Sequence, residues 1–185
     1  MDIYTKVAGI TQESVKDYKH HTLPNHVLSR QEMKTKQIEN ALRGFAAGCA
    51  EEDIEAYCNT GAFSNGKKGF LFSKEGLYGS MFDHLRKKNP IPQPICYDEL
   101  SDVSVAEDSA DYMCLCYKDG RRKSVCGSIY TGFLVTALKL ILGTGEENLS
   151  APNTDGMLTN DESNESEYSY ETARRCLKEG LDALE

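Results

Sequence analysis

The most apolar stretch of the chain runs from Ser128 to Leu142, and its spacing is that of a helix. Apolar side chains, Ile129 among them, recur every three or four residues, and further apolar positions widen this surface most of the way round. Such a helix has to be buried on several sides. It is shorter than the roughly 20 apolar residues that span a bilayer, and it carries Lys139, so a transmembrane segment is not expected here.

A second helical pattern is predicted from about Arg30 to Gly48. Ser29 and Glu32 form a capping-box pattern, in which each side chain bonds a backbone amide at a helix start. The apolar residues that follow share one face, which can dock on the sheet of the same chain or on a second copy: Ile38, Ala41, Leu42, Phe45 and Cys49. A shorter helical turn is predicted from Glu51 to Tyr57.

From Lys68 onward the apolar period changes to that of strands. Turn signals separate the apolar runs, and Asp119-Gly120 is typical of a two-residue hairpin. In such a hairpin Val125 lies opposite Cys114, and Cys126 points to the other face of the sheet. We expect strands at 70–72, 77–82, 95–97, 103–105, 112–117 and 122–126. The sequence therefore predicts an α+β fold with about six or seven short antiparallel strands that end in the buried helix.

The charge of the chain is unevenly distributed. Its 29 acidic and 21 basic side chains give a formal net charge of −8. Residues 144–185 hold 11 of the acids and 3 of the bases, so the rest of the chain is electrically neutral. Because nucleic-acid binding needs a clustered basic surface, a nucleic-acid partner is not expected.

The length of 185 residues suits one domain with extensions. We expect an N-terminal helical segment at 1–50, a strand-rich domain at 51–143, an acidic flexible linker at 144–169 and an amphipathic helix at 170–185. The last helix either folds back on its own domain or binds a partner or a second subunit. Its candidate partner-binding residues are Tyr170, Leu177, Leu181 and Leu184.

The cysteines and the N-terminus bear on the compartment. Seven cysteines, an odd number without toxin-like spacing, do not indicate a disulfide framework. No apolar signal segment is visible at the N-terminus. These two features predict a reducing cytoplasm.

Two stretches of the sequence match a phosphate-binding or a metal-binding pattern only in part. The stretch Gly61–Lys68 matches the first seven positions of the phosphate-binding loop pattern, but Lys68 replaces the magnesium-binding hydroxyl and a strand follows in place of a helix. His20, His21 and His26 lie in a polar loop without Cys or acidic ligands at matching spacing. We therefore expect no catalytic, metal or cofactor site at these positions.

The order of elements resembles that of the pleckstrin-homology-like (PH-like) barrel, and in particular the bacterial PH-like domains. Ala62–Tyr78 is similar to the opening hairpin of these domains. That hairpin consists of a glycine, an apolar strand, a turn, a second glycine and then an apolar residue followed by tyrosine. Ile95–Leu100 is similar to their isoleucine-x-tyrosine-x-x-isoleucine element. The resemblance covers about residues 50–143. It implies a PH-like barrel at 51–143 whose C-terminal helix plugs a bent sheet, and a binding or assembly module without a known reaction.

Three functions follow as hypotheses. The first is a non-catalytic module that binds another protein or itself. The second is phosphoanion or lipid-head-group binding, as in eukaryotic relatives of the fold, through basic residues in predicted turns: Lys67, Lys68, Lys74, Arg121, Arg122 and Lys123. The neutral body weakens attraction to anionic membranes, so a membrane partner is not expected. The third is an enzyme with a Cys–His pair that includes His84, which nothing local in the sequence supports. The aromatic residues Phe63, Phe70, Phe72, Tyr78 and Phe82 are predicted to belong to the core.

Overall fold

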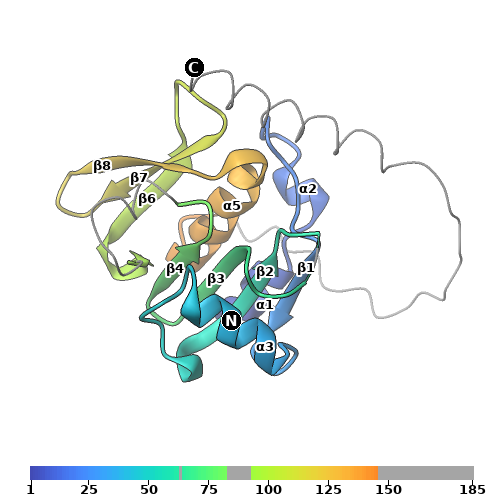
Figure 1. Cartoon of the computed structure of the whole chain (residues 1–185). Helices are drawn as coiled ribbons and strands as arrows, with labels where there is room; N and C mark the ends of the chain where they lie inside the picture. The colour runs from blue at the N-terminus through green and yellow to red at the C-terminus, as the bar shows by residue number, and fades with distance from the viewer. Residues whose placement is uncertain (63, 83–92, 146–185) are drawn as a thin grey trace, which may run out of the picture. The chain divides into compact units, whose positions relative to one another are not determined.

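The computed structural model describes residues 1–62, 64–82 and 93–145, which form an α+β fold (Figure 1). The elements, in chain order, are α1 (Ile3–Ala8), α2 (Gln12–Val15), β1 (His26–Ser29), α3 (Thr35–Arg43), the 3-10 helix η1 (Glu51–Asp53), β2 (Ile54–Asn59), β3 (Gly69–Ser73), β4 (Gly76–Gly79), β5 (Ile95–Cys96), η2 (Tyr97–Glu99), β6 (Leu100–Val105), β7 (Tyr112–Tyr117), β8 (Arg122–Cys126), η3 (Ser128–Tyr130) and α5 (Thr131–Leu142).

The strands form two antiparallel sheets in which neighbours in sequence are neighbours in space. One sheet has five strands in the order β1-β2-β3-β4-β5, and the other has three in the order β6-β7-β8. Among the described residues no strand pair joins the two sheets, so they do not form a closed barrel. None of the helices within these ranges has the combination of length and apolarity needed to cross a bilayer.

Helix α5 is the buried helix that the sequence predicts. Phe133, Leu134, Ala137 and Leu138 are at most 1 % exposed. The helix packs against β6, β7, α1 and α2, and its side chains share one apolar core with inward residues of both sheets. Ile129, expected on the buried surface, is instead 44 % exposed because it lies in η3, before α5 begins.

Helix α3 is shorter than predicted and begins five residues later. The backbone N–H and the hydroxyl of Ser29 do donate to the Glu32 carboxylate, at 2.7 and 2.8 Å. However, Ser29 ends β1, and these bonds close the turn that follows the strand. The N-cap of the helix is Lys34, whose backbone N–H donates to Gln37 Oε1 at 2.7 Å, and the first helical residue is Thr35. The predicted start at Arg30 was therefore wrong.

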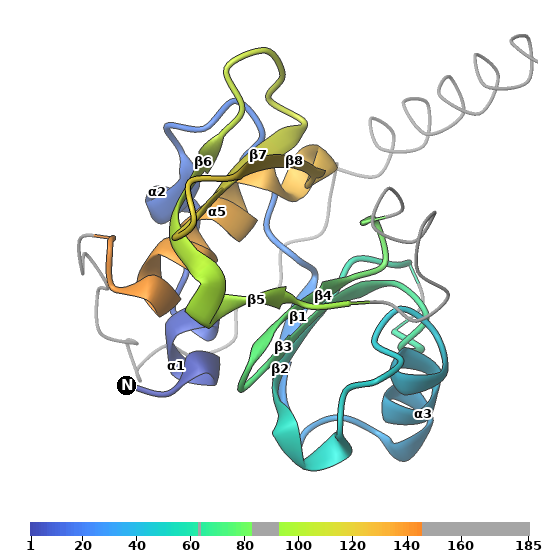
Figure 2. The ribbon, with the colours of Figure 1, turned by 90° about the vertical axis from the view of Figure 1, so that its left-hand side faces the viewer.

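The apolar face of α3 docks on the chain's own five-stranded sheet. Its buried residues Ile38 and Ala41, and Phe45 just after the helix, belong to a second core cluster that includes Tyr57 and Leu71. Figure 2 shows α3 on one side of this sheet and α1 and α5 on the other. Both faces of the five-stranded sheet are therefore covered.

Two strands were absent from the sequence prediction. Only Glu51–Asp53 of the predicted helical turn is helical, and Ile54–Asn59 is strand β2. The polar stretch that contains His26 forms β1, which pairs with β2, so residues 1–50 include a strand as well as helices. Strand β2 is buried on both faces and so lacks the apolar–polar alternation that reveals a strand in sequence.

The hairpin of β7 and β8 was predicted with the right strands but the wrong register. Its loop has three residues, because the backbone N–H of Tyr117 donates to Arg121 O at 2.9 Å, and Gly120 takes a positive φ of 86°. Val125 therefore lies opposite Met113. The added residue puts Cys126 on the same face of the sheet as Cys114 and Cys116, which corrects the predicted orientation.

The loop between β2 and β3 is bonded to α3. Gln37 Nε2 donates to Ser64 O at 2.9 Å, and Asn40 Nδ2 donates to Asn65 O at 2.6 Å. Gly66 has a φ of 78°, and a Cβ at this position would lie 2.1 Å from Gln37 O. The loop thus needs glycine for its backbone conformation and for its contact with α3.

Gly66→Ala should destabilise the protein more than Gly120→Ala. Both glycines have positive φ, which costs an L-residue about 1–2 kcal/mol. A Cβ at Gly120 meets no atom within 4 Å, whereas one at Gly66 collides with the α3 backbone. Urea unfolding should therefore give a loss for Gly66→Ala at least twice that for Gly120→Ala. Equal losses would show that the loop does not pack on α3.

Candidate functional site

The described residues cover the three-stranded sheet on one face only. Val103, Met113, Leu115 and Val125 are fully buried on the α5 side. On the opposite side, residues of β6, β7 and β8 stand in two rows across the strands, and all of them are at least partly exposed. We call these residues the outer face: Asp102, Cys116 and Arg122 in one row, and Ser104, Cys114 and Ser124 in the other.

The outer face is hollowed. Its six residues line a hollow of about 390 Å³, together with four residues from the end of β6 and the loop that follows: Val105, Ala106, Glu107 and Asp108. Thiols and short apolar side chains contribute to the lining alongside hydroxyls and charged groups. The loop is held in place by hydrogen bonds from Ala106 N–H to Tyr112 O, at 2.9 Å, and from Asp111 N–H to Ser109 Oγ, at 3.3 Å.

The charges in the hollow are unbalanced. Asp102, Glu107 and Asp108 contribute three exposed carboxylates, and Arg122 contributes one guanidinium. Among the described residues, none of these four groups forms an ion pair. Across β7, the backbones of Asp102 and Arg122 are two strand spacings apart, which is about 10 Å. The hollow therefore has an excess of negative charge that is not neutralised from within the described part of the chain.

The surroundings of Cys114 disfavour its thiolate form. Burial and the neighbouring Cys116 thiol raise the pKa of Cys114, and the positive charge of Arg122 only partly opposes them. Cys114 is therefore a neutral thiol at neutral pH. In the ranges that the structure describes, no group of three or more His, Cys, Asp and Glu side chains has an arrangement that could hold a metal ion.

The six basic residues proposed from the sequence as an anion site lie at three separate places in the fold, and two of them, Arg122 and Lys123, lie in strand β8 and not in the predicted turn. Lys67 and Lys68 precede β3, whereas Lys74 follows it. Six residues of extended chain place Lys68 and Lys74 about 20 Å apart. Arg121, Arg122 and Lys123 belong to the hairpin of the other sheet. The structure thus does not bring the six together at one site.

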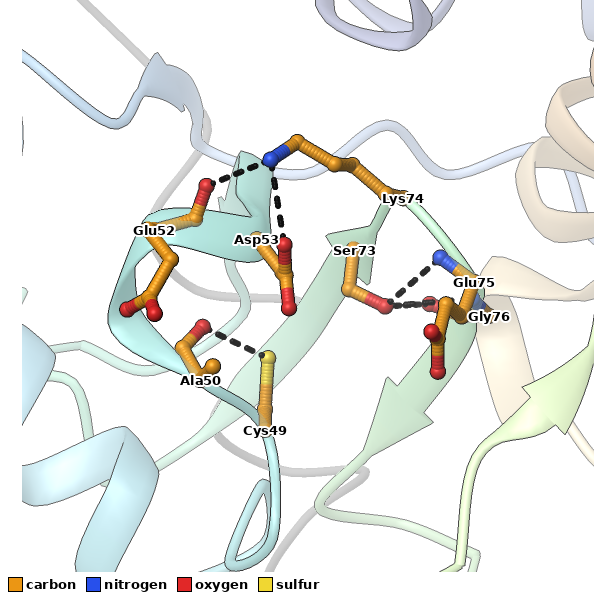
Figure 3. A network of polar contacts seen from close by, with 8 residues as sticks. All are labelled: Cys49, Ala50, Glu52, Asp53, Ser73, Lys74, Glu75 and Gly76. Carbon is orange, nitrogen blue, oxygen red and sulfur yellow. Dashed lines mark hydrogen bonds and ion pairs between the residues drawn. The ribbon is translucent and has the colours of Figure 1, made fainter.

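Lys74 is part of a local network that ties η1 to the turn between β3 and β4 (Figure 3). Its Nζ donates to Glu52 O at 2.9 Å and to Asp53 Oδ1 at 3.0 Å. The hydrogen bond to Asp53 raises the pKa of Lys74. In the same turn the Ser73 hydroxyl donates to Gly76 O, at 2.9 Å, and accepts from Gly76 N–H, at 3.1 Å. These contacts explain Lys74 as a structural residue.

Arg121 also has local partners. Its Nε donates to Asp119, and its guanidinium lies 4.8 Å from the centre of the Tyr117 ring. The remaining basic residues of the predicted anion site, Lys67, Lys68, Arg122 and Lys123, are exposed. Four predicted partner-binding residues of the tail lie outside the described residues: Tyr170, Leu177, Leu181 and Leu184. His84 and Phe63 also lie outside them.

The histidines and the glycine-rich stretch have structural surroundings. His20 Nε2 pairs with Asp111 at 3.1 Å, His21 Nδ1 contacts Tyr18 O at 3.0 Å, and His26 begins β1. The stretch Gly61–Lys68 connects two strands. The segment before this stretch is strand β2 and not the predicted helix. Strand β3 follows the stretch in place of a helix, so it has no helix N-terminus whose backbone amides could bind phosphate.

Sequence reasoning missed the acidic side of the hollow. Asp102 and Ser104 alternate with apolar residues along β6, which is the signal of a half-exposed strand. The prediction used only the apolar residues of this stretch and assigned Cys126 to the opposite face. Without the register, no pattern in the sequence joins Asp102, Glu107 and Asp108 to the thiols.

Iodoacetamide should alkylate Cys114, Cys116 and Cys126 in the folded protein but should not alkylate Cys58. Cys58 is 0 % exposed, and burial raises its pKa well above the ordinary value. Relative to the urea-unfolded chain, we expect the rate to fall at least about 100-fold at Cys58 and by no more than about tenfold at the other three. Peptide mass spectrometry of timed samples gives these rates. Protection of Cys126 equal to that of Cys58 would contradict the three-residue hairpin loop.

No protein-family model, curated protein or solved structure matches this chain. The resemblance to bacterial PH-like domains therefore rests on the residues named above and stays a prediction.

Proposed function

We propose that this chain is a PH-like binding or assembly module that binds another protein through the outer face, without catalysing a reaction. The observation that carries the proposal is a sheet face that the described residues leave open and hollowed. The five-stranded sheet offers no such face, because core clusters cover it on both sides.

The order of the elements supports the PH-like part of the proposal. A five-stranded antiparallel sheet is followed by a three-stranded one and then by a single apolar helix that packs on the inner side of the second sheet. The two stretches that carry the resemblance lie in the five-stranded sheet and where the chain passes from it to the three-stranded sheet. Ala62–Tyr78 contains the hairpin of β3 and β4, and Ile95–Leu100 runs from β5 through η2 to the start of β6.

The shape of the outer face supports binding over simple solvation. One solvated face is ordinary for an antiparallel sheet, but such a face is usually filled out by its own polar side chains. Here the middle of the face is a hollow of about 390 Å³, which is large enough for an anchoring side chain. Protein interfaces obtain most of their binding energy from a few anchors that fill such depressions.

The other two functions have less support. An anionic ligand at the hollow would meet three carboxylates. The predicted basic residues are dispersed over three places in the fold, and two of them, Lys74 and Arg121, already have partners. A cysteine nucleophile is disfavoured at Cys114 because its pKa is raised. Protein binding is therefore the function that the geometry supports best.

Site-specific photo-crosslinking tests this proposal. p-Benzoylphenylalanine in place of Ser124, on the outer face, should give a discrete heavier species when the full chain is illuminated in a lysate of its source cells. The matched control is the same residue in place of Lys36, which is exposed on α3. Illumination of the purified protein alone distinguishes a second copy from a different protein. Identical products from both positions, or none from Ser124, would contradict the proposal.

A further inference from the structure

We propose that the hollow receives a basic, extended segment of the partner, with arginine or lysine side chains placed beside Asp102 and beside Glu107 and Asp108. This inference rests on the proposed function and names the chemistry of the partner. It is carried by the hollow together with three exposed carboxylates that have no cation partner among the described residues.

The acids stand at two ends of the hollow. Asp102 lies near the start of β6, and Glu107 and Asp108 follow its end. Asp102 and Glu107 are five residues apart, so the chain can separate them by at most about 16 Å. A segment laid along β6 in an extended conformation would therefore reach both ends with two basic residues four or five positions apart.

The lining between the acids suits the stems of such side chains. Cys114 and Cys116 offer polarizable sulfur, and Val105 and Ala106 offer apolar surface. Arginine and lysine pack their aliphatic stems on surfaces of this kind while the charged ends reach carboxylates. The hydroxyls of Ser104 and Ser124 can accept hydrogen bonds from the charged ends or from the backbone of the segment.

Charge separates this occupant from other candidates. Inorganic phosphate and anionic lipid would be repelled by the net negative charge of the hollow. The chain's own residues 144–185 carry 11 acids against 3 bases, so charge does not favour them as the occupant either. Binding of a basic segment should weaken with salt, because the screening length is about 10 Å at 0.1 M and shortens as salt rises.

A pair of peptides tests the inference on the ¹⁵N-labelled full chain. The first contains Arg-Ser-Gly-Ser-Arg between neutral residues, and its twin has glutamate in place of both arginines. The arginine peptide should shift the amide resonances of residues 102–108, 114–116 and 122–124 in a saturable way, and the glutamate twin should not. Equal shifts with both peptides, shifts centred on another surface, or no shifts at millimolar peptide would overturn the inference.

Three variants make the test sharper. Asp102→Asn with Asp108→Asn should weaken binding of the arginine peptide at least about tenfold, since both ends of the hollow lose a charge. The matched control, Asp17→Asn with Glu39→Gln, removes two exposed acids elsewhere and should leave the affinity unchanged within about twofold. Arg122→Gln should strengthen binding because it removes the one cation of the hollow. Equal effects of the two double variants, or weaker binding by Arg122→Gln, would contradict the proposed role of these charges.

The experiments distinguish failure of the basic-segment inference from failure of the proposed function. If Ser124 crosslinks to a partner but the arginine peptide does not bind, the basic-segment inference is wrong and the outer face remains the binding surface. If the crosslink is also absent, both proposals are overturned.

Discussion

The burial of α5 is the constraint on which the rest of the structure depends. A helix that is apolar on nearly all sides needs several partners, and it obtains them from β6, β7, α1 and α2. The chain enters the helix through a tight turn, in which the backbone N–H groups of Gly127 and Ser128 both donate to Asp111 O at 2.8 Å. Because α5 takes the inner face of the three-stranded sheet, Asp102 and Ser104 of β6 and Arg122 and Ser124 of β8 are left on its outer face.

The difference between the two sheets follows from their sequences. Strands β2, β3 and β4 are buried almost throughout, and they are covered by α3 on one side and by the main core on the other. In β6 and β8, Val103 and Val125 face inward, whereas Asp102, Ser104, Arg122 and Ser124 face outward. Among the described residues, the outer face is open because α3 packs on the five-stranded sheet and not on the three-stranded one. The charged residues of the outer face lie outside the apolar core.

Part of this structure can be predicted from the sequence. The α+β class, the buried C-terminal helix and the extents of β7 and β8 follow from apolar spacing and turn signals. Strands β1 and β2 do not, because β2 is buried on both faces and β1 has only four residues and depends on pairing with β2. One residue in the hairpin loop decided the orientation of Cys126. The hollow could not be predicted because its acids and thiols are neighbours only in the observed strand register. The basic residues of the predicted anion site are easy to recognise in the sequence, but in the fold they are dispersed or already have partners.

The proposed function requires that the outer face, which the described residues leave open, is also open in the complete chain. Paramagnetic relaxation by a neutral, soluble gadolinium chelate measures this directly on the side-chain protons of full-length protein. The β-methylene protons of Cys114 and Cys116 should relax strongly, whereas the side chains of Tyr57 and Leu71, which lie under α3, should be protected. Protection of the two cysteines equal to that of Tyr57 would mean that another part of the chain covers the face, and it would contradict the proposed function.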